Sequence, residues 1–178
     1  MQIKTVFAGF GGQGVLMMGY SLAHAAMHEG LHVTYLPSYG AEVRGGTANC
    51  TVAVSDEEIA SPVASQPDFI VAMNTPSLMA FQTRIAPGGA FFLNSSIVEG
   101  RPNRSDITLY EIPAAAIASD LGNPRVQNVV MMGAYVKATR LVSADTYLKS
   151  LKSILGSRKK AAMEVNRKAF SAGYDTVD

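Results

Sequence analysis

The chain has 178 residues, a formal net charge of +1 and a single cysteine, Cys50. One cysteine excludes an intrachain disulfide and an iron–sulfur cluster held by the cysteines of this chain. The near-zero net charge excludes the general electrostatic attraction that draws proteins to nucleic acid or to anionic membranes.

Charged residues make up only 16% of the chain, against about 25% in an average globular protein. Because an isolated domain needs a solvated surface, this shortfall predicts that partner chains cover much of the protein. The length predicts one domain spanning residues 1–178. The N-terminus lacks a signal-peptide pattern, and no apolar run meets the transmembrane criterion, so a cytoplasmic protein without membrane contact is expected.

A glycine-rich turn at residues 9–14 is the first informative segment. It follows an apolar run at residues 3–8, which is typical of a buried strand, and it precedes an apolar helix predicted over residues 12–29. Its glycines have the G-x-G-x-x-G spacing of a Rossmann-like strand–turn–helix unit. Such glycines let backbone N–H groups approach a ligand or another chain at the positive end of a helix.

A second strand is predicted over residues 32–36 and a third over residues 47–54. The connection between them has no helical period and is only just long enough for a parallel crossover, which usually contains a helix. A mixed sheet is therefore expected, with the third strand a candidate for the antiparallel direction. The predicted fold class is α/β, a Rossmann-like three-layer fold with a mostly parallel, mixed sheet.

The rest of the chain alternates between strand and helix patterns. Ser55 and the acids after it predict a capped helical turn, and Asn74 with Pro76 predicts a helix start. Gly133 and Ala134 allow another element to approach their helix closely, and apolar residues on two sides of that helix predict that it is buried on both. Strands are expected over residues 69–73, 90–93 and 107–111, and further helices over residues 113–121, 126–141, 143–156 and 157–172.

The glycine turn lacks the other groups that nucleotide sites need. A dinucleotide site has an acid about 20 residues after the glycines, where it binds the ribose hydroxyls. Thr34 stands there, and the strand ends without an acid. The turn also lacks the Lys-Ser/Thr pair of a P-loop, and His24 and His28 lack the Glu of a zinc-protease motif. No nucleophile–base pair can be identified.

A second glycine-rich segment, residues 38–47, places one acid and one base, Glu42 and Arg44, among three glycines. In an open α/β sheet the loops at the carboxyl ends of the strands gather at one rim. This segment, the glycine turn and Asn74 are therefore expected to lie together. Two interpretations remain open: a structural turn with Glu42 and Arg44 solvated or paired, or charge-assisted contacts with a ligand or partner chain.

The turn at residues 9–14, combined with the segment at residues 38–46, resembles the gamma subunit of 2-oxoacid:ferredoxin oxidoreductases. Residues 68–74 resemble the next strand of that family, and Asn128 with residues 131–134 resembles its later helix. The resemblance covers nearly the whole chain, and the two glycine motifs together are more specific than either one alone.

The resemblance implies a multisubunit enzyme that converts a 2-oxoacid, coenzyme A (CoA) and oxidised ferredoxin into an acyl-CoA, CO2 and reduced ferredoxin. It implies thiamine diphosphate, Mg and iron–sulfur clusters in the alpha, beta and ferredoxin-like partner subunits, with ferredoxin as acceptor. For this chain it implies a Rossmann-like fold with no cofactor and no independent catalysis. Overall similarity favours 2-oxoglutarate or a branched-chain 2-oxoacid as substrate.

Three alternatives stay open: the small subunit of an indolepyruvate ferredoxin oxidoreductase, a free-standing nucleotide-binding module, and a structural homodimer. No catalytic or metal-ligating residue is expected in the chain. The candidate ligand-binding or partner-binding residues are Gly9, Gly11, Gly12, Gln13, Gly14, Ser38, Tyr39, Glu42, Arg44, Gly45, Gly46 and Asn74.

Overall fold

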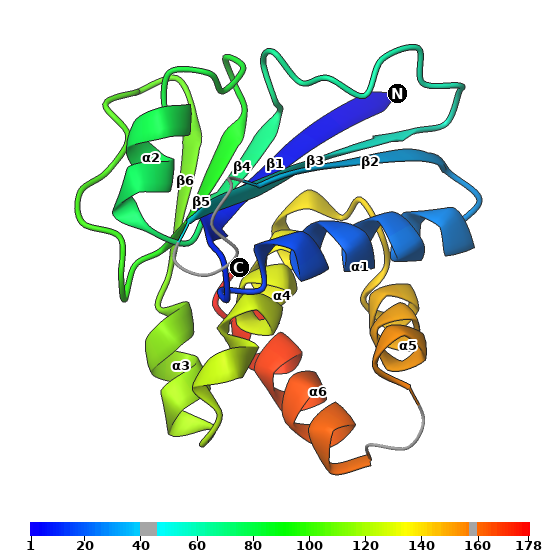
Figure 1. Ribbon diagram of the computed structural model, residues 1–178, viewed down its shortest axis with the longest axis vertical. Helices are drawn as coiled ribbons and strands as arrows, with labels where there is room; N and C mark the ends of the chain where they lie inside the picture. Colours follow the sequence, from blue (N-terminus) through cyan, green and yellow to red (C-terminus); the bar gives the residue numbers. More distant parts are fainter. Residues whose placement is uncertain (40–45, 157–159) are drawn as a thin grey trace.

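The computed structural model describes residues 1–39, 46–156 and 160–178. Within these residues, a six-stranded sheet carries helices on both faces (Figure 1). The strands are β1 (Gln2–Phe10), β2 (His32–Tyr39), β3 (Thr47–Ser55), β4 (Phe69–Ala72), β5 (Ala90–Asn94) and β6 (Thr108–Ile112). The helices are α1 (Val15–His28), α2 (Thr75–Phe81), α3 (Ala114–Asp120), the 3-10 turn η1 (Pro124–Val126), α4 (Gln127–Thr139), α5 (Ala144–Leu155) and α6 (Lys160–Tyr174).

The sheet is mixed, with the strand order β2-β3-β1-β4-β5-β6. Strands β1, β4, β5 and β6 are parallel, whereas β3 runs antiparallel to both of its neighbours, β1 and β2. The predicted fold class and the antiparallel third strand are therefore confirmed. Two reversals of direction leave β2 pointing the same way as β1, but with β3 between them.

The strand sequences follow these positions in the sheet. Strands β4 and β5 are almost entirely buried, as expected of parallel strands covered on both faces. In β3 the buried residues Ala48, Cys50 and Val52 alternate with the more exposed Thr47, Asn49 and Thr51, because no helix covers the second face of the sheet there (Figure 1). Only an edge strand readily accepts a proline such as Pro37, which cannot donate a ladder hydrogen bond, and β2 is an edge strand.

Helix α4 lies at the centre of the helical layer, and its residues 128–136 are all buried. Its Tyr135 ring packs against Phe7, Phe69 and Phe92 of the sheet, and its hydroxyl forms a 2.6 Å hydrogen bond with Thr5 Oγ1. This burial on two sides confirms the sequence prediction.

Helix α6 crosses α4 at two glycines. A Cβ atom added to Gly133 would lie 2.0 Å from the carbonyl oxygen of Phe170, and one added to Gly173 would lie 1.8 Å from that of Val130. The predicted close approach at Gly133 is therefore confirmed.

Two local predictions were wrong. The first helix begins at Val15 and not at Gly12, because Gly14 takes a left-handed conformation with φ 74° that ends the turn just before the helix. Ser55 does not cap a helical turn: it ends β3, and its hydroxyl accepts the backbone N–H of Glu57 at 3.0 Å. The predicted start of the last helix at residue 157 lies outside the described residues. No helix in the described part is long and apolar enough to cross a membrane.

Candidate functional site

The glycine turn connects β1 to α1 at the carboxyl end of β1. Gly14 is the N-cap of α1, with φ 74°, and Gly12 has φ 99°. Both values lie in the left-handed region that residues with a side chain rarely adopt. The first turn of α1 has neither a side-chain cap nor an acidic residue, so the helix itself does not compensate the partial positive charge of this end.

Packing within the chain explains part of the glycine spacing. A Cβ atom at Gly9 would lie 2.6 Å from Gln13 Oε1 and 2.9 Å from Met73 Cβ, and one at Gly14 would lie 2.4 Å from Asn128 Nδ2. At Gly12, in contrast, an added Cβ would meet open space. Gly9 and Gly14 are therefore required by the fold itself, whether or not a ligand binds.

Gln13 fixes the turn to the neighbouring strand. Its Oε1 accepts the backbone N–H of Phe10 at 2.7 Å and the Nδ2 group of Asn74 at 3.2 Å, and its Nε2 donates to the carbonyl oxygen of Met73 at 3.1 Å. Asn74 in turn caps α2, because its Oδ1 accepts the backbone N–H of Ser77 at 2.9 Å. We call Gln13 with Phe10, Met73 and Asn74 the Gln13 clamp; it ties the ends of β1 and β4 together.

The second glycine segment meets the first at the end of the β1–β3 pairing, where Phe10 stands opposite Thr47. Gly11 donates its backbone N–H to the carbonyl oxygen of Gly46 at 3.0 Å. Ser38 is exposed near the end of β2 and pairs with Asn49 of β3. The other predicted residues of this segment, Glu42, Arg44 and Gly45, and the side chain of Tyr39, lie outside the described residues.

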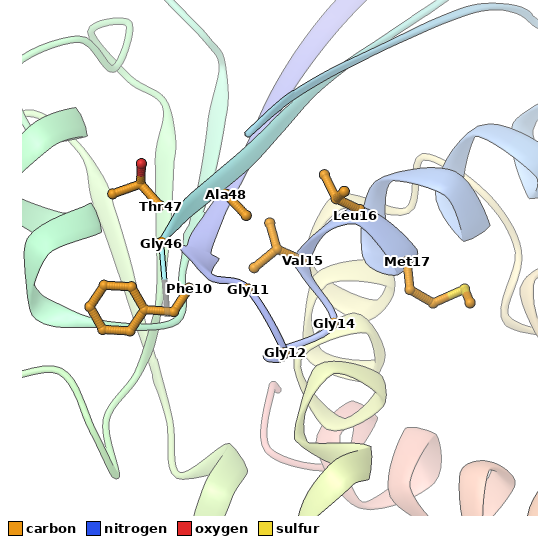
Figure 2. Close-up of a pocket in the computed structure, with 10 residues that line it drawn as sticks. All are labelled: Phe10, Gly11, Gly12, Gly14, Val15, Leu16, Met17, Gly46, Thr47 and Ala48. Atoms are coloured by element: carbon orange, nitrogen blue, oxygen red, sulfur yellow. The ribbon is translucent and has the colours of Figure 1, made fainter. Parts of the chain in front are cut away.

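A pocket of about 550 Å³ opens between the glycine turn, the start of α1 and the start of β3. In Figure 2 the Leu16 and Ala48 side chains converge on it from α1 and β3, whereas the Phe10 ring extends away from α1. The described residues that line it are Phe10, Gly11, Gly12, Gly14, Val15, Leu16, Met17, Gly46, Thr47 and Ala48.

Sequence reasoning missed the apolar half of this lining, which consists of Phe10, Val15, Leu16, Met17 and Ala48. One signal was available: Leu16 and Met17 follow the glycine turn in a first helical turn without polar or charged residues. None of the described lining residues is titratable. They can therefore hold an apolar group beside backbone N–H donors, but they supply no acid, base or nucleophile.

The strand order also explains why the nucleotide motif is incomplete. In a dinucleotide site the second strand lies beside the first, so that its terminal acid reaches the ribose. Here β3 is inserted between β1 and β2, which places β2 about 10 Å from β1, twice the normal strand spacing. The Gly11 N–H is also used by Gly46 of the same chain.

The residues present do not fit a metal or an iron–sulfur cluster. Cys50 is fully buried, its thiol donates to the carbonyl oxygen of Val15 at 3.6 Å, and burial raises its pKa to about 12. A cluster ligand must be a thiolate and needs several cysteine neighbours. No group of three or more His, Cys, Asp or Glu residues that could hold a metal occurs in the described ranges.

The fold and the site together define a Rossmann-like α/β domain whose glycine rim lacks the determinants of nucleotide binding. The chain belongs to the pyruvate ferredoxin/flavodoxin oxidoreductase family, whose model matches residues 4–176. The resemblance inferred from the two glycine motifs is thereby confirmed.

Among its relatives is the ketoisovalerate oxidoreductase subunit VorA of Methanothermobacter thermautotrophicus, which is 36% identical over 98% of this chain. The chain spans only 36% of that relative. It is 35% identical to the 2-oxoglutarate synthase subunit KorC of Methanocaldococcus jannaschii, over 99% of this chain and 95% of the relative.

A solved structure has the same fold as this chain. The 2-oxoglutarate:ferredoxin oxidoreductase from Magnetococcus marinus, with 2-oxoglutarate, coenzyme A and succinyl-CoA bound, matches with a TM-score of 0.90 and 25% identity. The match covers 98% of this chain and 31% of that one. The same domain therefore occurs as a separate subunit and as about one third of a longer chain.

Proposed function

We propose that this chain is a gamma subunit of a 2-oxoacid:ferredoxin oxidoreductase and forms one gamma domain over residues 1–178. The observation that carries the proposal is its similarity to the KorC subunit, which is 35% identical over 99% of this chain. The complex would convert a 2-oxoacid, CoA and oxidised ferredoxin into an acyl-CoA, CO2 and reduced ferredoxin.

In this proposal the chain supports the active site and does not itself catalyse. Thiamine diphosphate with Mg, which stabilises the carbanion left by decarboxylation, and the iron–sulfur clusters, which carry electrons to ferredoxin, would belong to the alpha, beta and ferredoxin-like subunits. The lack of titratable groups among the described residues of the pocket lining and the buried state of Cys50 support this division.

The substrate is proposed to be 2-oxoglutarate or a branched-chain 2-oxoacid. Support comes from the two relatives above, which are named for ketoisovalerate and 2-oxoglutarate and are similar to this chain to nearly the same degree. The side chains that distinguish these acids are proposed to lie in the partner subunits, since none of the described residues that line the pocket is a cation that would bind a second carboxylate.

Co-expression with the other subunits tests the proposal. A tagged chain is expected to co-purify with a thiamine-binding and a ferredoxin-like subunit and to be needed for reduction of ferredoxin. Pyruvate, 2-oxoglutarate and 3-methyl-2-oxobutanoate are compared as substrates. Full activity of a complex that lacks the chain would contradict the proposed role.

The same preparation tests the proposed rim. Glu42 and Arg44 are proposed to make charge-assisted contacts with a partner or ligand at the glycine rim. Arg44→Ala should then weaken assembly or turnover, and a variant that assembles and turns over like the natural chain would remove Arg44 from the site.

A further inference from the structure

The outward face of α1 is apolar although it is exposed. Met17, Tyr20 and Met27 are 37%, 47% and 64% exposed, and their spacing puts them on one side of the helix. His24 and His28 complete this side of the helix, which contains no Asp, Glu, Lys or Arg. A helix whose outward side faces water usually carries charged residues there.

The other sides of α1 are already covered by the protein. Gly19 packs on β3, where an added Cβ would lie 2.4 Å from Cys50 Sγ, and Ser21 forms a 2.9 Å hydrogen bond with Tyr147 of α5. The sheet and α5 therefore account for two sides of an almost wholly apolar helix (Figure 1). The third side has no cover among the described residues, although its composition resembles that of the covered ones.

The exposed side of α1 continues into the glycine rim and onto the edge of the sheet. Met17 also lines the pocket. The Tyr20 ring lies 6.1 Å from that of Tyr35 in β2, the edge strand of the sheet. We call Met17, Tyr20 and Met27 the α1 surface.

We propose that the α1 surface binds the partner subunit that corresponds to the remainder of the VorA-type chain; this rests on the proposed function. In VorA this domain is 36% of one polypeptide, so most of that chain is other protein joined to it. In a separate subunit the same association must be non-covalent, and a contiguous apolar surface provides its driving force.

The charged residues beside the α1 surface favour this partner subunit over a second copy of the chain. Helix α5, on one flank of the α1 surface, carries Lys149, which pairs with Asp145 at 2.6 Å, and Lys152, which has no ion pair with any described residue. The opposite flank, β2, contains no acid. A copy turned about an axis along α1 would bring β2 against these lysines, and one turned about an axis across α1 would bring α5, with two lysines and one acid, against itself. Neither arrangement supplies a spare acid for Lys152. The expected partner surface is apolar with an acidic margin on the α5 side.

A matched pair of substitutions tests the proposal. Met27 and Met79 are 64% and 63% exposed, and they lie on α1 and α2, on opposite faces of the sheet (Figure 1). Met27→Glu and Met79→Glu thus make the same change at equal exposure. Their circular dichroism and melting temperature as isolated chains establish that both fold. Binding to the purified remaining subunits is then titrated with a fluorophore-labelled chain.

Met27→Glu is expected to weaken binding at least tenfold, because a carboxylate would be buried against an apolar partner, and Met79→Glu is expected to bind like the natural chain. Equal affinities for both variants and the natural chain would overturn the α1 surface while leaving the proposed function intact. The proposal would also be overturned, with the proposed function intact, if the isolated chain is a dimer and Met27→Glu dissociates this dimer without changing the affinity for the other subunits. Failure of the natural chain to bind those subunits would overturn the proposed function as well.

Discussion

Replacing Gln13 by Glu turns one amide group of the Gln13 clamp into an oxygen and leaves the shape of the side chain unchanged. Gln13 is half-buried, and its Oε1 accepts two hydrogen bonds that a carboxylate would also accept. Its Nε2, however, donates to the carbonyl oxygen of Met73 at 3.1 Å. In the variant this contact would join a carboxylate oxygen to a carbonyl oxygen, and neither atom can donate.

The expected loss of folding stability follows from the loss of this one hydrogen-bond donor. An unpaired buried acceptor costs about 1–3 kcal/mol, and the half-burial of Gln13 favours the lower part of this range. For a domain of this size about 1 kcal/mol shifts the melting temperature by about 2–4 °C. Gln13→Glu should therefore melt about 2–8 °C below the natural chain at pH 7, measured by calorimetry or circular dichroism.

Opposing effects act on the pKa of the new carboxyl group. The contact with Met73 favours the protonated form, which can donate to the carbonyl oxygen. The two donors to Oε1 and the N-terminal end of α1 favour the carboxylate. The comparison is therefore made at pH 7, where the carboxylate leaves the Met73 carbonyl oxygen without a donor.

Gln127→Glu is the matched control. Gln127 is half-buried and stands at the start of α4, and its Oε1 accepts a 3.0 Å hydrogen bond from Asn94 Nδ2 that a carboxylate would retain. A negative charge at a helix N-terminus is favourable by about 0.3–1 kcal/mol, so this variant should be as stable as the natural chain or slightly more so. A Gln13→Glu variant that melts like Gln127→Glu at pH 7 would refute the assigned clamp.

Two further predictions concern the core. Gly133→Ala should lower the free energy of unfolding, measured in urea, by about 3 kcal/mol or more, because the new Cβ would lie 2.0 Å from the carbonyl oxygen of Phe170. This loss is expected although Ala is the better helix former by about 1 kcal/mol. Ser171→Ala, on the exposed side of α6, is the control, and a stabilised Gly133→Ala variant would contradict the close crossing of α4 and α6. Burial raises the pKa of the Cys50 thiol to about 12. At pH 8 the thiol should therefore react with a thiol reagent at least about 10³-fold more slowly in the folded chain than in the chain unfolded in urea. Similar rates in the two states would show that the thiol is accessible in the folded chain.

The sequence contained enough information for the order of elements and for several of their ends. Asn74 and Ser143 were identifiable as helix caps because capping depends on a side chain and a backbone N–H only three residues away, and both make that bond. The antiparallel β3 was predictable because a short connection without a helix cannot easily form a parallel crossover.

Contacts between distant parts of the chain could not be predicted in this way. The Gln13 clamp joins residues 60 positions apart, and nothing near Gln13 in the sequence indicates Met73 as its partner. The Ser55 prediction failed for a related reason. Its local pattern suits a helix cap, but Ser55 pairs with Gln2 and His32 in the sheet, and the next residue, Asp56, forms an ion pair with the N-terminal amine. These tertiary contacts outweigh a local preference of about 1 kcal/mol.

The inserted strand links the incomplete nucleotide motif to the proposed role. With β3 between β1 and β2, the start of β3 reaches the glycine turn, and Gly46 accepts the Gly11 N–H. What remains accessible is the uncapped first turn of α1 beside the apolar side chains of Leu16 and Met17. An uncapped helix N-terminus next to an apolar pocket suits a protein partner that offers an apolar side chain and a carbonyl or carboxylate oxygen. The geometry that removes the ribose site therefore leaves a rim suited to protein contact, continuous with the α1 surface.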